Sequence, residues 1–173
     1  MARQGSNLIV MGIDPSLTST GYAIIDYFSE QFFALDYGLI KTKSSQSLPD
    51  RLSEIFHTVS KLVEKHHPDV VAFEDVFYAK NPRIALLMGH ARAASLVAAA
   101  IRNISVAEYS AREIKMSVSG YGNASKEQVK RMVLSQIKID DASIGYDISD
   151  AFAVALCHLY RQKHQLFTQR NIL

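Results

Sequence analysis

A chain of 173 residues, 48% of them hydrophobic and 21% charged, is long enough for one domain with a sizeable core, and this composition excludes disordered and collagen-like classes. Its single cysteine, Cys157, excludes an intramolecular disulfide and a cluster of thiolate metal ligands. The net charge of +2 favours neither an acidic nor a basic partner, so charge has to be followed along the chain.

Hydrophobic patterning in the first part of the chain predicts a three-stranded antiparallel meander followed by a helix. Residues 8–14 form an apolar run typical of a buried strand, and residues 21–27 and 31–41 have the pattern of its neighbours. Pro49 begins a segment whose apolar residues recur at helical spacing as far as His66. We therefore expect three strands and then one helix.

The rest of the chain alternates between helix-like and strand-like segments. The predicted strands are 70–73 and 105–109, the predicted helices are 82–102, 111–118, 125–136 and about 148–165, and 137–146 is predicted to be a loop. A meander followed by such alternation predicts an α/β fold with a five-stranded mixed sheet flanked by helices. We expect a single domain over residues 1–173, with flexible tails at 1–7 and about 166–173.

The N-terminal segment has one basic residue and then a short apolar run that Gly12 and Asp14 interrupt. This pattern is not that of a signal peptide or a transmembrane span, so we expect no membrane association and a cytoplasmic location.

Two acidic residues stand where predicted strands end. Asp14 follows the first strand and Glu74 follows the fourth. If these strands are adjacent and parallel, both carboxylates emerge at one edge of the sheet, where α/β folds place their ligands. Asp14-Pro15 is also a common turn start, and Glu74 with Asp75 could be an exposed pair in a loop.

A second pair of acids begins the last predicted helix. Asp147 and Asp150 are three residues apart and share one helix face, and the apolar run behind them indicates that the helix is buried. The alternative is a structural role, in which Asp147 caps the helix and Asp150 favours its positive end.

Four converging carboxylates repel one another unless a cation neutralises them. Oxygen ligands without cysteine favour Mg²⁺ or Mn²⁺ over zinc, and two such ions can activate water and stabilise the leaving oxygen of a phosphodiester. Residues 76–138 hold ten Lys or Arg and three acids, while the remainder holds nine basic and fourteen acidic residues. This distribution suits a protein that holds a polyanion and binds cations, although ordinary solvated faces explain it equally well.

Four motifs resemble RuvC-type crossover junction endodeoxyribonucleases, the bacterial Holliday junction resolvases. They are GIDPSLTSTGYAI, FEDVFYAKNPRIALLMGHARAASLVAAA, EYSAREIKMSVSGYGNASKEQVKRMV and DISDAFAVALCH, and the resemblance extends from about Ile9 to His158. It implies a ribonuclease H-like fold, a homodimer, and symmetric metal-dependent nicking of opposing strands of a four-way DNA junction. It also implies a role in recombination and repair with the RuvA–RuvB branch-migration complex as a partner.

The resemblance assigns roles to individual residues. By motif position the catalytic and metal-binding acids are Asp14, Glu74, Asp147 and Asp150, with Mg²⁺ as the cofactor, Mn²⁺ as a substitute and two ions per site. Phe77 matches an aromatic position that contacts junction bases, and Lys115 and Lys126 match basic positions near the cleaved phosphates. Phe77 could instead be a core residue, Lys115 and Lys126 solvated charges, and Arg83 and Arg92 are weaker candidates for phosphate contact.

Two residues depart from the family pattern. Ser16 stands where a glycine is usual, which is mildly unfavourable if the turn needs a positive φ angle. Asp75 stands where glutamine is common, which adds an acid beside Glu74.

Three other functions share part of this pattern. An actin-like or sugar-kinase ATPase shares a Gly-Ile-Asp loop with hydroxyl residues, but it needs two lobes and a second glycine-rich phosphate loop. A ribosomal-RNA-processing nuclease of the YqgF type shares the fold, but the Asp147-x-x-Asp150 helix start and EYSAREIK follow the resolvase pattern. A junction-binding protein without catalysis is disfavoured because all four acids are present.

Overall fold

The computed structural model of the chain describes residues 7–75, 81–139 and 144–170, the last of these from 165 onward as backbone only. The elements are β1 (Leu8–Asp14), β2 (Ser19–Phe28), β3 (Gln31–Lys41), α1 (Leu48–His66), β4 (Val70–Glu74), α2 (Pro82–Ala100), β5 (Ser105–Tyr109), α3 (Ala111–Ser119), α4 (Lys126–Gln136), β6 (Ile137–Lys138) and α5 (Tyr146–Arg170). They follow the predicted order, and α5 continues beyond its predicted end near Gln165.

The sheet within the described residues has six strands in the order β5-β4-β1-β2-β3-β6. Strands β1, β2 and β3 form the predicted antiparallel meander, and β4 and β5 extend it in parallel from β1. The prediction of five strands was wrong, because Ile137 and Lys138, predicted to lie in a loop, pair in parallel with Phe32 and Phe33 of β3. Two residues are too few to produce a periodic signal.

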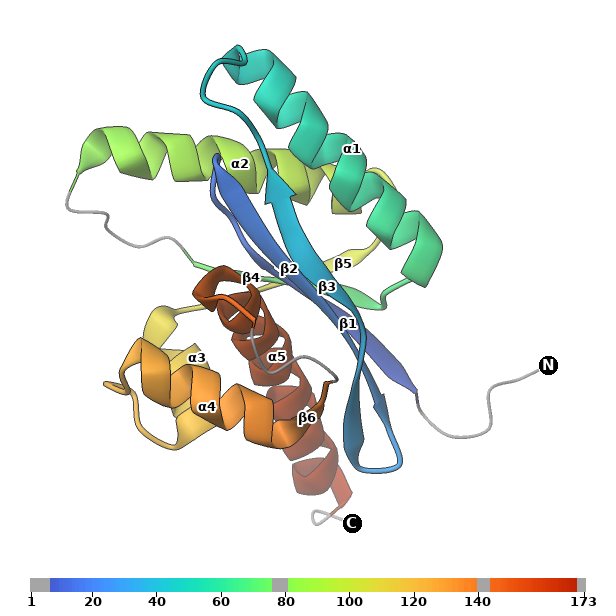
Figure 1. Ribbon diagram of the computed structural model, residues 1–173. Coiled ribbons are helices and arrows are strands. Elements are labelled where there is room, and N and C mark those ends of the chain that lie inside the picture. The colour runs from blue at the N-terminus through green and yellow to red at the C-terminus, as the bar shows by residue number, and fades with distance from the viewer. Residues whose placement is uncertain (1–6, 76–80, 140–143, 171–173) are drawn as a thin grey trace.

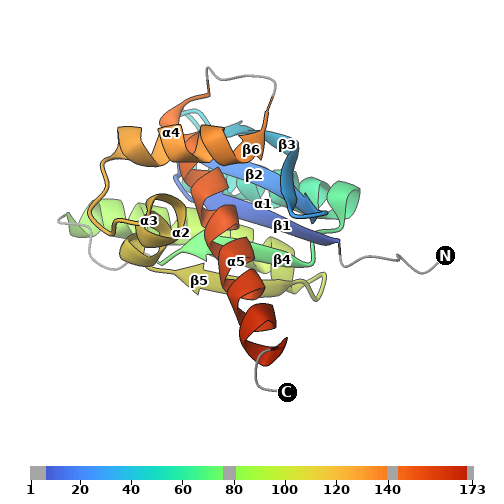
Figure 2. The same cartoon turned by 90° about the horizontal axis from the view of Figure 1, so that it is seen from below.

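Helices cover both faces of this sheet, which makes three layers (Figure 1). Helices α1 and α2 pack on one face, and α5, with α3 and α4 outside it, packs on the other (Figure 2). Strand β1 serves both layers because its side chains alternate: Val10 belongs to the α5 cluster, and Met11 and Ile13 belong to the α1–α2 cluster. No helix in the described part of the chain is long and apolar enough to cross a membrane.

Local sequence signals define where the helices near the candidate site begin. Ser110 caps α3 and Ser125 caps α4, and in both a capping box closes the first turn, with Glu113 and Gln128 as the reciprocal partners. Gly120 ends α3 with a φ angle of 73°, a conformation that glycine adopts without strain. These caps fix the starts of the two helices that lie over α5.

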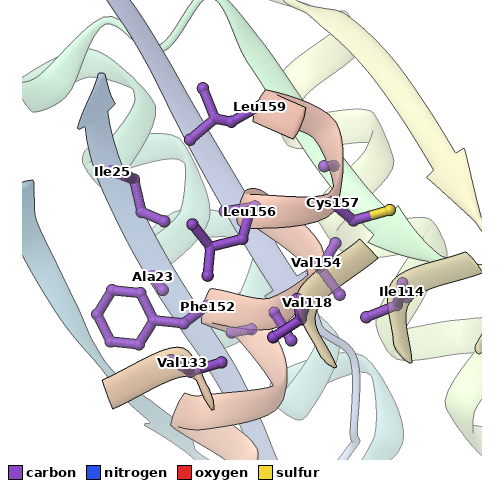
Figure 3. Packing of buried hydrophobic residues seen from close by; sticks show 14 of the residues in the cluster. Ala23, Ile25, Ile114, Val118, Val133, Phe152, Val154, Leu156, Cys157 and Leu159 are labelled. Carbon is purple, nitrogen blue, oxygen red and sulfur yellow. The ribbon is translucent and has the colours of Figure 1, made fainter. Parts of the chain in front are cut away.

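The larger hydrophobic cluster is centred on α5 (Figure 3). Phe152 and Leu156 are fully buried on its side toward Ala23 and Ile25 of β2, while residues of α3 and α4 close the cluster from outside. The helix is therefore apolar nearly all around its middle, as the run AFAVALC predicts.

Helix α5 lies unusually close to the sheet because two glycines face it. A Cβ atom added at Gly12 would stand 2.1 Å from the carbonyl oxygen of Ala151, and one added at Gly21 would stand 2.1 Å from that of Asp147. Real Cβ atoms do not come this near to backbone atoms, so any side chain at either position must push α5 away.

We expect Gly12→Ala to lower the free energy of unfolding by about 1–3 kcal/mol, because the new methyl group overlaps the α5 backbone. Urea unfolding followed by circular dichroism measures the change. Gly89→Ala is the matched control: nothing lies within 4 Å of an added Cβ there, and alanine favours the helix by up to about 1 kcal/mol. Equal destabilisation by both changes would contradict the close packing.

Candidate active site

The first two acids lie side by side at one edge of the sheet. Strands β1 and β4 are parallel neighbours in which Ile13 is paired with Phe73, so Asp14 and Glu74 follow at the same level. The condition on which the sequence argument depended, that these strands are adjacent and parallel, is confirmed.

The second pair reaches this edge from α5. Asp14 is paired across the strands with Gly21, and the α5 backbone at Asp147 rests directly on Gly21. Because Asp150 is one helical turn further along, both aspartates lie close to the end of β1. The structure thus brings all four predicted acids together from β1, β4 and α5.

Two of these acids have hydrogen-bond donors that the sequence did not indicate. The Ser19 hydroxyl donates to a carboxylate oxygen of Asp147 over 2.9 Å. The Lys126 ammonium, at the start of α4, donates to a carboxylate oxygen of Asp150, also over 2.9 Å. Both contacts join residues far apart in the chain, so no periodic pattern could have predicted them.

An open pocket of about 600 Å³ lies over the acids. Its walls include Asp14, Glu74 and Asp150 together with residues of α3 and α4, among them Lys115 and Lys126. Asp147 is not part of the wall, although it is near enough for its charge to affect Asp14. The pocket therefore offers both carboxylates and ammonium groups, and one of the ammonium groups, Lys126, contacts Asp150 directly.

Burial and mutual repulsion make Asp14 hard to ionise. Burial raises the pKa of Asp14, and the charges of Asp150, Glu74 and Asp147 raise it further, to about 7, while Lys126 opposes them. The pKa of Glu74 is raised as well, by burial and then by Asp150, with Lys126 and Lys115 acting in the opposite direction. A cation added to the pocket would stabilise the charged forms of both acids.

The ligand atoms suit a hard divalent cation chemically, but their side chains, as the structure describes them, do not form a preorganised coordination sphere. All four predicted ligands are carboxylates, which Mg²⁺ and Mn²⁺ prefer. Among the described residues, however, no three His, Cys, Asp or Glu side chains stand close enough to enclose one metal ion. Asp150 is engaged by Lys126 and Asp147 by Ser19, so closure around an ion requires these side chains to rearrange.

The two departures from the family pattern have clear structural settings. Ser16 is not among the residues with a positive φ angle, so serine causes no backbone strain there. Its N–H donates to the Thr20 hydroxyl over 3.1 Å, and that hydroxyl donates back to the Ser16 carbonyl over 2.6 Å. Asp75 adds a further carboxylate to the pocket wall, and its N–H donates to the Tyr109 carbonyl over 2.8 Å.

The residues predicted to contact DNA lie in different parts of the structure. Lys115 and Lys126 both line the pocket, whereas Phe77 lies outside the described residues. Arg92 pairs with Glu108 over 2.6 Å, and Arg83 is exposed on the first turn of α2. Of these residues, only the two lysines stand beside the acids in the structure that is described.

A mixed sheet with carboxylates at its edge, covered by helices on both faces, defines the ribonuclease H-like class of nucleases. Two solved structures share this fold. The Thermus thermophilus RuvC in complex with a Holliday junction substrate has a TM-score of 0.86 and 28% identity, with 91% of this chain and 96% of that chain covered. The yeast mitochondrial Holliday junction resolvase Ydc2 shares the fold with a TM-score of 0.68 at 17% identity, over 94% and 82% of the two chains.

Sequence comparison specifies the family within this class. The profile of the family described as "Crossover junction endodeoxyribonuclease RuvC" matches residues 10–158. Crossover junction endodeoxyribonucleases RuvC from Alkaliphilus oremlandii and Citrifermentans bemidjiense are 39% and 41% identical over 153 residues, which is 88% of this chain and 93% of each relative. The chain belongs to the RuvC family of Holliday junction resolvases. It is therefore an endodeoxyribonuclease, a hydrolase of a metal-dependent kind.

We expect Asp14→Asn to stabilise the protein in EDTA at pH 8. Because the pKa of Asp14 is raised to about 7 on folding, its ionisation is resisted in the folded state. Its contribution to stability is present below the unfolded pKa near 3.8 and is lost as pH rises through 7. The gain at pH 8 is up to about 4 kcal/mol, measured by urea unfolding, and disappears below pH 4.

Asp36→Asn should change the folding stability in the opposite direction. Burial acts to raise the pKa of Asp36, but hydrogen bonds from Lys65 and His66 outweigh it and lower the pKa. Its stabilisation is therefore present above the unfolded pKa and is lost as pH falls through the lowered value. Asp36→Asn should destabilise the protein at pH 8. If Asp14→Asn also lost stability at this pH, the raised pKa of Asp14 would be contradicted.

Proposed function

We propose that Asp14, Glu74, Asp147 and Asp150 form the catalytic centre with which this nuclease cuts the strands of a four-way DNA junction. The observation that carries the proposal is the electrostatic coupling of Asp14 to the three other acids, which come from β4 and α5. A purely structural role explains one capping aspartate, but it does not explain why a fold would gather four partly buried, mutually repelling carboxylates, three of them in the wall of one pocket.

The metal is Mg²⁺, for which Mn²⁺ substitutes, and two ions bind per site. The four carboxylates would hold them, and bound ions would supply an activated water and stabilisation of the leaving oxygen. The donor set supports this choice because it consists of oxygen atoms. The raised pKa values of Asp14 and Glu74 support it too, because a bound cation would stabilise the ionised form of both acids.

The chain's own residues position the substrate. Lys115 and Lys126 line the same pocket as the acids, where they neutralise phosphates that would otherwise be repelled. Ser19 fixes the orientation of Asp147 by its hydrogen bond. Phe77 remains a predicted base contact, since it follows Glu74 closely in the chain and aromatic rings stack on unpaired bases.

A second copy of the chain is the partner that symmetric cutting requires, since each chain carries one such centre. Helix α2 offers a surface for it. Leu86, Val97 and Ile101 lie at spacings that place them on one helix face, and they are 61%, 50% and 59% exposed. This apolar stripe supports a homodimer formed through α2. A RuvA–RuvB partnership and a cytoplasmic location remain family-based predictions.

The decisive test of the catalytic centre uses a synthetic four-way junction with Mg²⁺, with Mn²⁺ and with EDTA. We expect the wild type to nick opposing strands only with metal, and Asp14→Asn and Glu74→Gln to lose at least 10³-fold in rate, because each removes a charge on which the ions depend. Junction binding in EDTA should change little. Full activity of either variant, or equal cutting of linear duplex by the wild type, would refute the proposal.

Val97→Glu tests the α2 surface. A charge buried in an apolar interface should shift the protein from dimer to monomer at micromolar concentration and lower paired nicking at least tenfold. Sedimentation velocity and junction cleavage measure the two effects. Leu35→Glu, an equally drastic change at an exposed residue of β3, is the control and should remain dimeric. A dimer that survives Val97→Glu would exclude this interface.

A further inference from the structure

Helices α4 and α5 face each other through two contacts that lie one turn apart. The first joins Lys126 to Asp150, with 2.9 Å between nitrogen and oxygen. In the second, the Lys130 ammonium lies over the ring of Tyr146, 5.5 Å from its centre. On each helix the two contacting residues are four positions apart, so the second contact lies about 6 Å from the first along each helix axis.

The second contact lies just outside the pocket. Lys126 and Asp150 are part of its wall, whereas Lys130 and Tyr146 are not. Tyr146 also directly precedes Asp147, and its side chain is exposed. The pair therefore lies next to the part of the pocket wall that Lys126 and Asp150 form.

Folding gives little reason for a tyrosine at this place. The residue begins α5, its ring is outside both hydrophobic clusters, and its hydroxyl makes no hydrogen bond within the described part of the chain. An exposed cation–π contact adds little to stability. An aromatic ring beside a lysine is, however, the combination with which proteins bind single nucleic-acid strands: the ring stacks on a base and the cation neutralises the adjacent phosphate.

We propose that Tyr146 and Lys130 bind the nucleotide next to the cleaved phosphate, with the Tyr146 ring stacked on its base and Lys130 on its phosphate. This inference rests on the proposed function, because it needs the cut strand to pass through the pocket. It adds a subsite on α4 and α5, separate from the four carboxylates. The base it accepts is unpaired or unstacked, as bases are at the branch point of a junction.

The test uses the full chain carrying Asp14→Asn, so that the junction is bound without being cut. The probe is 2-aminopurine, whose fluorescence falls when it stacks on an aromatic ring, placed in separate junctions on either side of the cleavage position mapped with the wild type. We expect quenching at one of the two positions. Tyr146→Ala should abolish the quenching and weaken junction binding about 5- to 150-fold, whereas Tyr146→Phe should retain both.

Lys130→Gln tests the phosphate contact separately. The logarithm of the binding constant falls with the logarithm of salt concentration. Removal of one phosphate-bound cation should make this negative slope less steep by about 0.7–0.9. An unchanged slope would exclude the phosphate contact of Lys130. Thermal unfolding of every variant checks that the fold is intact.

Phe28→Ala is the matched control, because this exposed aromatic residue lies at the far end of β2, about 23 Å from Gly21 along the strand. It should leave binding, salt slope and fluorescence unchanged. If Tyr146→Ala also leaves them unchanged while Asp14→Asn abolishes cutting, the subsite is wrong and the catalytic centre stands. If the wild type does not cut junctions, or Asp14→Asn still cuts, the proposed function itself fails.

Discussion

The close contact between α5 and the two central strands is the constraint on which the candidate site depends. Gly12 and Gly21 leave room for the helix backbone, which therefore approaches the sheet more closely than side chains would permit. Because Gly21 is paired with Asp14, the beginning of α5 is held over the end of β1. The positions of Asp147 and Asp150 thus follow from backbone packing and not from attraction between the acids, which repel one another.

The same packing brings the acids close enough to repel one another. The residues around them offset this repulsion. Asp14 is deprived of water by the helix above it and is exposed to the charges of the other acids, so its pKa rises. The fully apolar contacts of Phe152 and Leu156 anchor α5 against this repulsion. Lys126 supplies the compensating charge from α4, and its bond to Asp150 raises its own pKa. Core packing therefore holds together a site that its charges alone would separate.

The sequence predicted those parts of the site that depend on regular geometry. Strand ends located Asp14 and Glu74, and helix phase placed Asp147 and Asp150 on one face. The adjacency of β1 and β4 was only a condition of that argument, since periodicity does not say which strands pair. The contacts of Ser19 and Lys126 were missed because side-chain bonds between distant segments leave no local pattern. Strand β6 was missed because its two residues depend on β3 for their structure.

The uneven charge of the sequence has a spatial counterpart in the fold. Lys115 and Lys126 come from the basic middle of the chain, on α3 and α4, and they line one pocket together with acids from β1, β4 and α5. The caps at Ser110 and Ser125 fix the beginnings of these helices, and so fix where the two ammonium groups stand. A phosphodiester in this pocket would meet both ammonium and carboxylate groups. Charges that are separate in the sequence thus come to line one pocket only after α3 and α4 have packed onto α5.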